Sequence, residues 1–174
     1  MIVTTSVNGQ YLLGMQATYN DSFRSWEVSV EMDSTTTIEG SLSITWDLRN
    51  DFSDWSFSIG DYDGTISQVF NNNAGRWELR SGNNVVSITQ TWPGDTSEWD
   101  IRSKNTKTKM ITTIDDDGPL WINKERKNGE LAVYMERNGD PRVWIIEDYM
   151  NADVPFLHRL ASAFISIYAS CPKL

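Results

Sequence analysis

The segment that most restricts the fold is an almost wholly apolar stretch near the C terminus, residues 154–170. Its apolar residues cover most of the circumference of the helix that their spacing predicts. Ordinary surface helices bury a stripe about 100° wide or somewhat more. The only interruption here is a narrow polar stripe beside Arg159, made of His158, Ser162, Ser166 and Ser170. A helix with so little polar surface is predicted to be buried over much more than half of its circumference.

The ends of this helix are marked by helix-start and helix-stop residues. Asp153 is predicted to be the N-cap, and Pro155 falls in the first turn, where its missing N–H is tolerated. Pro172 stops the helix. A helix of about 17 residues is roughly 25 Å long, which is about the depth of a small β-barrel.

The rest of the chain alternates apolar and polar residues with a period of two, as half-buried strands do. The clearest run is 38–48, in which Trp46 and Leu48 continue the apolar face, and 26–32 alternates in the same way. Asn-Gly and Asp-Gly pairs, which suit tight hairpins, separate many of the segments. Ten shorter segments complete the pattern: 11–17, 55–59, 66–70, 77–79, 86–88, 99–101, 110–114, 120–123, 131–135 and 143–147.

About a dozen amphipathic strands followed by an apolar helix predict one mainly β domain over residues 1–174. We expect an antiparallel, closed β-barrel of about twelve strands around the C-terminal helix, because closure removes exposed strand edges. The alternative is a lipocalin-like barrel or a β-sandwich with the helix packed outside. A Trp-acid-aliphatic-Arg pattern recurs at Trp46, Trp77 and Trp99, but its spacings of 31 and 22 residues are too unequal to predict a solenoid or propeller.

In this arrangement the chain resembles the tubby C-terminal fold, which LURP-one-related proteins and phospholipid scramblases share. The resemblance rests on the strand count, on the segment 143–148 (VWIIED) before the helix and on Ala163-Phe164-Ile165 within it. It implies a twelve-stranded barrel threaded by an apolar helix. It also implies phosphoinositide binding through basic residues on the barrel surface, as in some tubby-like domains.

Composition and charge exclude several classes of function. The net charge of −9 argues against nucleic-acid binding, which needs cations against phosphates. Residues 1–100 contain fourteen acids and four Arg, whereas residues 101–174 contain ten acids and eleven Lys or Arg. The single Cys171 forms no internal disulfide, residues 1–6 have no secretory pattern, and no apolar run is long enough to span a membrane. We therefore expect a cytoplasmic protein.

No catalytic or metal-binding pattern stands out. His158 is the sole histidine, and Ser162 follows it by one helical turn, but no carboxylate or oxyanion hole is evident to complete a triad. The Asp-Gly segments at 61–64 and 115–118 lack the final Glu of a calcium loop and are typical of turns. We expect a non-enzymatic protein with no cofactor and no metal.

Two kinds of binding remain. The first is a protein-interaction module, for example an inhibitor or immunity-type protein against a basic partner, that uses an acidic face of Asp47, Asp51, Asp54, Asp61 and Asp63. The second is recognition of phosphoinositide or other anionic lipid head groups by a basic region between residues 102 and 127. Its residues are Arg102, Lys104, Lys107, Lys109, Lys124, Arg126 and Lys127. The acidic excess is the larger feature and favours protein interaction.

Overall fold

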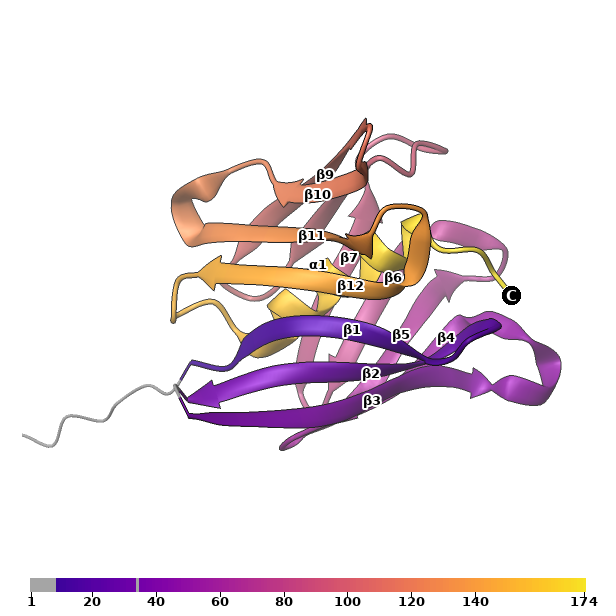
Figure 1. Ribbon diagram of the computed structural model, residues 1–174. Coiled ribbons are helices and arrows are strands. Elements are labelled where there is room, and N and C mark those ends of the chain that lie inside the picture. Colours follow the sequence, from indigo (N-terminus) through magenta and orange to yellow (C-terminus); the bar gives the residue numbers. More distant parts are fainter. Residues whose placement is uncertain (1–8, 34) are drawn as a thin grey trace, which may run out of the picture.

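The computed structural model describes residues 9–33 and 35–174 (Figure 1). The prediction that residues 1–6 carry no secretory pattern therefore lies outside the described residues. In the described part of the chain, twelve strands and two 3₁₀ turns precede one α-helix. Their bounds are β1 Tyr11–Tyr19, β2 Ser22–Asp33, β3 Thr36–Trp46, η1 Asp47–Arg49, β4 Asp51–Ile59, β5 Tyr62–Phe70, β6 Asn73–Ser81, β7 Asn84–Gln90, β8 Glu98–Arg102, β9 Lys107–Asp115, β10 Gly118–Asn123, η2 Arg126–Asn128, β11 Gly129–Arg137, β12 Asp140–Met150 and α1 Phe156–Ser170.

The twelve strands form one antiparallel sheet in chain order, and β1 pairs with β12 to close it into a barrel. The predicted mainly β fold and closed barrel are confirmed. Inward positions of each strand meet the core and outward positions meet solvent, which is why the period of two located every strand. The alternative of a lipocalin-like barrel or a β-sandwich with the helix packed outside is wrong, because the sheet is closed and the helix is buried.

Helix α1 fills the interior of the barrel (Figure 1). Every residue of 156–167 is buried, and the helix contacts strands on several sides of the ring, including β1, β7, β8 and β12. Phe164 packs edge-on against Trp55 and Trp77, with ring centroids 5.6 and 5.5 Å away. The helix is thus the central layer of the core, as its apolar circumference predicts.

The helix starts later than predicted, and its cap is a different residue. It begins at Phe156 with Pro155 as N-cap, no side chain caps it, and the amides of His158 and Arg159 bond to the Pro155 carbonyl. Asp153 lies in the preceding turn, so its prediction as the N-cap is wrong. Proline fits this position because its φ of −60° leads into a helix without strain.

The polar stripe of the helix is satisfied by hydrogen bonds within the protein; His158, Ser162 and Ser166 are buried, and Ser170 is half-buried. Ser162, Ser166 and Ser170 each donate to the helix carbonyl four residues earlier, at 2.8–2.9 Å. His158 lies between the hydroxyls of Ser103 and Thr108, 3.0 Å from Nδ1 and 2.8 Å from Nε2. These bonds allow polar groups to be buried in an apolar core.

A tryptophan repeats in every even-numbered strand. Successive buried tryptophans from β4 to β12, one in each even-numbered strand, are 22 or 23 residues apart: Trp55, Trp77, Trp99, Trp121 and Trp144. In β2, β4, β6, β8 and β12 the indole N–H donates to the carbonyl three residues earlier, at 2.8–3.0 Å. Next to Trp26, Trp55, Trp77 and Trp144, the same stretch is bulged against the neighbouring strand, so the indole closes each bulge. The barrel therefore consists of six similar hairpins.

The expected inward position of Trp46 and Leu48 is wrong. Strand β3 ends at Trp46, and η1 turns the chain away from the core, so Trp46 is half exposed and Leu48 is fully exposed. Trp55, nine residues on, takes the core position in this hairpin. Trp46 consequently does not belong to the structural repeat that includes Trp77 and Trp99.

A buried ion pair joins the closing strands to the helix. Asp148 of β12 accepts bonds from the Arg159 guanidinium at 2.5 Å and from the Leu12 amide at 3.0 Å. Arg159 also donates to the carbonyls of Val154, Met150 and Asn151. Both side chains of the pair are at most 1% exposed. Arg159, predicted only as a neighbour of the polar stripe, thus ties α1 to the seam between β1 and β12.

Candidate functional site

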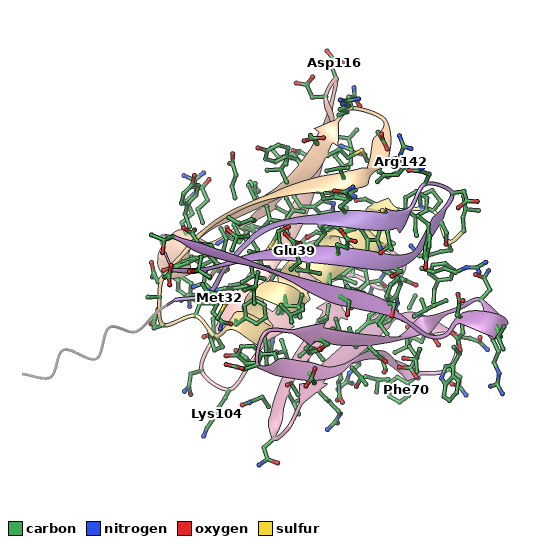
Figure 2. The ribbon with its side chains drawn as sticks, turned by 60° about the horizontal axis from the view of Figure 1, so that its bottom comes forward. Met32, Glu39, Phe70, Lys104, Asp116 and Arg142 are labelled. Atoms are coloured by element: carbon green, nitrogen blue, oxygen red, sulfur yellow. The ribbon has the colours of Figure 1, made fainter. Side chains whose placement is uncertain are left out.

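Six of the seven basic candidates gather at one end of the barrel. This is the end where even-numbered strands finish and α1 begins, called here the helix-start end; the opposite one is the helix-finish end. The six are all exposed and form the basic cluster: Arg102, Lys104, Lys107, Lys124, Arg126 and Lys127. They come from the β8–β9 and β10–β11 connections and the strand ends beside them. Figure 2 shows Lys104 at this end, far from Phe70 and Arg142 at the other.

Backbone contacts hold the two connections together. Arg102 and Lys107 are direct cross-strand partners. Asn128 donates to the Lys107 carbonyl at 3.2 Å, and Asn151 donates through its side chain to the Lys127 carbonyl and through its amide to the Asn128 carbonyl. These hydrogen bonds fix the β8–β9, β10–β11 and β12–α1 connections to one another. The backbone that carries the cationic side chains is therefore held in place.

Lys109, the seventh candidate, has a different role. It lies within β9, where its amine is 2.8 Å from Glu98, 3.6 Å from Asp100 and 3.1 Å from the Thr91 hydroxyl. The hydrogen bond to Glu98 is the main cause that raises the pKa of Lys109. Its charge is already matched by β8, so it is not available to a ligand in the way that the six others are.

A hollow of about 450 Å³ lies beside the basic cluster. Its wall includes Lys104 and Asn105 of the β8–β9 connection, Asn83 and Asn84 of β6–β7, and the first residues of α1. The side chains of these four residues make no hydrogen bond with any described residue and offer one ammonium and three amide groups. In the sequence the three asparagines are recognisable only as turn residues. No local sequence pattern indicates that the β6–β7 and β8–β9 connections meet at one hollow.

Several carboxylates limit the positive charge of this end. Glu130 lies 3.7 Å from Arg126, and Asp153 lines the hollow. Asp61 and Asp63 flank Tyr62, which also lines the hollow. A ligand therefore meets cations mainly on the β8–β11 side of the hollow.

The five acidic candidates do not share one face. Asp47, Asp51 and Asp54 lie around the β3–β4 connection, at the helix-finish end. Asp61 and Asp63 lie at the β4–β5 turn, at the helix-start end, and strand β4 separates the two groups by roughly 25 Å. Asp54 accepts bonds from Ser67 and from the Trp46 indole, at 2.8 and 3.2 Å.

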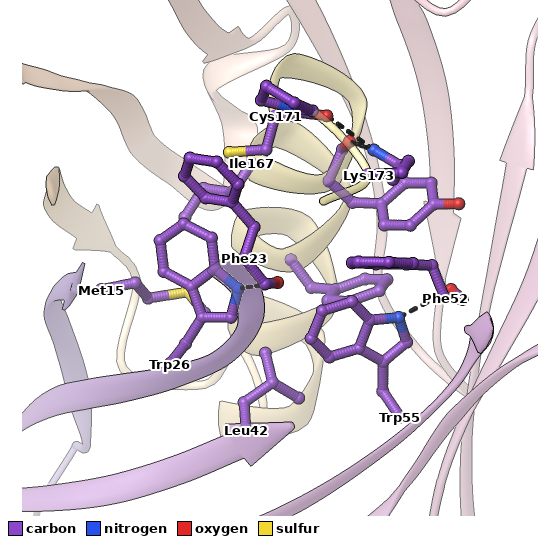
Figure 3. A pocket seen from close by; sticks show the side chains of 12 residues that line it. Met15, Phe23, Trp26, Leu42, Phe52, Trp55, Ile167, Cys171 and Lys173 are labelled. Atoms are coloured by element: carbon purple, nitrogen blue, oxygen red, sulfur yellow. Dashed lines mark hydrogen bonds between the residues drawn. The ribbon is translucent and has the colours of Figure 1, made fainter. Parts of the chain in front are cut away.

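An aromatic pocket at the helix-finish end has little room for a ligand (Figure 3). Trp26, Trp55 and Phe164 line it together with Cys171, and its free volume is about 20 Å³, which is enough for about one water. Burial raises the pKa of the Cys171 thiol to about 12. Lys173 closes this end of the helix by donating to the carbonyls of Tyr168 and Cys171. We regard the pocket as part of the packed core.

The residues considered for nucleophilic chemistry have structural partners. The Ser162 hydroxyl donates to the backbone carbonyl of His158, not to its ring. Burial lowers the pKa of His158 to about 4. Among residues 9–33 and 35–174, no three His, Cys, Asp or Glu side chains are grouped as a metal site would need, and no helix has the length and apolarity to cross a membrane.

Comparisons with protein-family models, with curated proteins and with solved structures found no match to this chain.

Proposed function

We propose that the protein is a binding module that recognises phosphate-bearing anionic head groups at the helix-start end of its barrel. The observation that carries the proposal is the convergence of six exposed cationic side chains from two connections 15 or more residues apart in sequence onto one end. Exposed Lys and Arg contribute about 1 kcal/mol each to binding an anionic surface.

The adjoining hollow supports the same proposal. Phosphate oxygens are hydrogen-bond acceptors, and Lys104 with three unpartnered Asn amides supplies donors of the matching kind. The uncapped first turn of α1 also lies at the hollow, and its dipole favours negative charge. The barrel around a central helix is the architecture that the resemblance to tubby-like domains implies, which adds support for a phosphoinositide head group.

Vesicle flotation tests this proposal. We expect the protein to float with phosphatidylcholine vesicles that contain a phosphoinositide and not with phosphatidylcholine alone, and to bind less at physiological than at low salt. A soluble inositol phosphate should compete with the vesicles for the protein if the head group alone is recognised. A lack of competition would assign the binding to the charged lipid surface.

A pair of charge-matched variants locates the site. Lys104→Glu/Lys107→Glu/Lys124→Glu should weaken vesicle binding by about 100-fold, since three surface cations are reversed. The control Arg49→Glu/Arg76→Glu/Arg137→Glu makes the same change in net charge at the helix-finish end. Its vesicle binding should weaken much less, because only the long-range charge repulsion increases and the basic cluster is intact. Equal loss in both variants, or no binding of the wild type at low salt, would contradict the proposal.

A further inference from the structure

Seven large apolar side chains of the described residues are exposed at the helix-finish end. Apart from Ile114 of β9 and the C-terminal Leu174, they are the five that form the apolar rim: Tyr19, Trp46, Leu48, Phe70 and Trp92. Leu48 is fully exposed, and between 51% and 63% of the surface of each of the others is accessible. They come from four successive connections, β1–β2, β3–β4, β5–β6 and β7–β8. Scattered exposed apolar residues are normal, but a series of them along one end of a barrel marks an interaction surface.

The positions of these residues are part of the hairpin repeat. Tyr19, Phe70 and Trp92 each precede the buried tryptophan of their hairpin by seven residues. Trp46 precedes Trp55 by nine, because η1 is inserted between them. Each rim residue lies two to four residues beyond the last buried inward position of its strand. The core therefore ends before the rim residue, and its side chain remains exposed. The repeat thus builds a row of buried indoles and, outside it, a row of exposed apolar groups.

Neighbouring contacts hold the rim in place. The Arg49 guanidinium lies over the Trp46 ring at 5.6 Å, and the Trp46 indole donates to Asp54. Arg76 lies over Phe70 at 5.9 Å. Successive connections are two strands apart, about 10 Å, so four of them span an arc of roughly 30 Å, which matches one side of a standard protein interface.

The charge around the rim is negative. All four connections belong to residues 1–100, where fourteen acids stand against four Arg. Segments 19–24, 46–54, 70–76 and 91–97 contain five Asp and three Arg. Hydrogen bonds from Ser53 and Ser97 lower the pKa values of Asp51 and Asp95, so both carboxylates stay ionised at neutral pH.

We propose that the apolar rim docks a cationic surface of a partner protein, with Trp46 and Leu48 as the anchoring residues. Trp, Tyr and Arg dominate the energetics of protein interfaces, and Arg49 stacked on Trp46 provides such a centre. The surrounding carboxylates select Lys- and Arg-rich partners and disfavour an anionic bilayer. This surface lies at the opposite end from the basic cluster and is independent of head-group binding.

Selection from a displayed random-peptide library on the immobilised protein tests the proposal. The enriched peptides should combine Lys or Arg with aromatic or aliphatic residues, and the best of them, made synthetically, is measured by fluorescence anisotropy. Leu48→Ser/Trp92→Ser should weaken its binding by at least about tenfold. The matched control, Val85→Ser/Tyr149→Ser, removes two exposed apolar side chains elsewhere and should leave the affinity within about twofold.

Charge is tested separately with Asp21→Lys/Asp47→Lys, which reverses two exposed carboxylates at the rim and should also weaken binding at least about tenfold. Enrichment of neutral or acidic peptides, no enrichment above that on Leu48→Ser/Trp92→Ser, or an equal loss in the Val85/Tyr149 control overturns the proposal. Two further results overturn it by naming another occupant. One is rim-dependent binding to phosphatidylcholine vesicles; the other is a concentration-dependent dimer, seen by sedimentation velocity, that the rim variant abolishes.

Discussion

The buried pair of Asp148 and Arg159 should be the most sensitive polar contact in the barrel. Asp148→Ala removes the carboxylate that pairs with the Arg159 guanidinium and leaves the Leu12 amide without its acceptor. Breaking a buried pair by removing one partner costs about 3–5 kcal/mol, because the remaining charge stays in the core uncompensated. That is a large part of the 5–15 kcal/mol that typically stabilises a domain.

Urea unfolding followed by tryptophan fluorescence measures this loss. Arg159→Met should lose a similar amount, and the double variant Asp148→Ala/Arg159→Met should lose less than the sum of the two by about 1–3 kcal/mol. Asp140→Ala is the control, because Asp140 pairs with Arg142 at 2.6 Å on the surface of the same strand and is screened by solvent. Its urea midpoint should remain near that of the wild type.

The pH dependence of Arg159→Met provides a second readout. Burial raises the pKa of Asp148, and Arg159 is the main opposing influence. Without Arg159 the folded-state pKa rises further above the unfolded value, so the folded state binds the proton more tightly. The stability of the variant relative to wild type should then be best at low pH and fall as pH rises above about 4. Additive losses in the double variant together with an unchanged pH dependence would refute the reasoning.

Three further predictions concern the core and the rim. His158 has a folded-state pKa of about 4 against about 6.5 unfolded, so wild-type stability should fall by up to about 3 kcal/mol as pH drops from 6.5 to 4, and urea titrations of His158→Gln should lack that slope. Trp77→Phe should lose about 1–3 kcal/mol by urea unfolding because it frees the Ala74 carbonyl, whereas Trp92→Phe, which is exposed, should stay within about 0.5 kcal/mol of wild type; equal losses would contradict the role of the buried indoles. Cys171 should react with a thiol reagent at pH 8 at least about 100-fold more slowly in the folded protein than in urea, and fast labelling of the folded protein would show that the helix-finish end opens.

The fold was largely predictable because its rules are local. Alternation identified all twelve strands, and the apolar circumference of α1 predicted that it lies inside. The same rule failed at Trp46 and Leu48, since a two-residue pattern does not show where a strand ends and a 3₁₀ turn begins. The spacing of 22 residues between buried tryptophans was visible in the sequence, but comparing Trp46 instead of Trp55 with Trp77 hid it.

The sites were less predictable because they depend on which connections meet. The basic residues lie in two successive connections at the same end of an antiparallel sheet, which sequence order alone suggests. The pairing of Lys109 with Glu98 and Asp100 depends on the register of β8 and β9, and the contact between Asp148 and Leu12 joins residues 136 positions apart. No local pattern records either contact.

The closing of β1 on β12 determines when this protein can finish folding during its synthesis. Each hairpin can form as it leaves the ribosome, but β1 has to wait for its partner until more than a hundred further residues have been translated. Helix α1, which fills the interior, follows every strand in the chain. Until α1 emerges, the incomplete barrel has two unpaired strand edges, and its apolar inward side chains are not covered by the helix. Both features promote association with other chains. We expect productive folding in the cell to wait until α1 has been translated and to depend on protection of the partly made barrel.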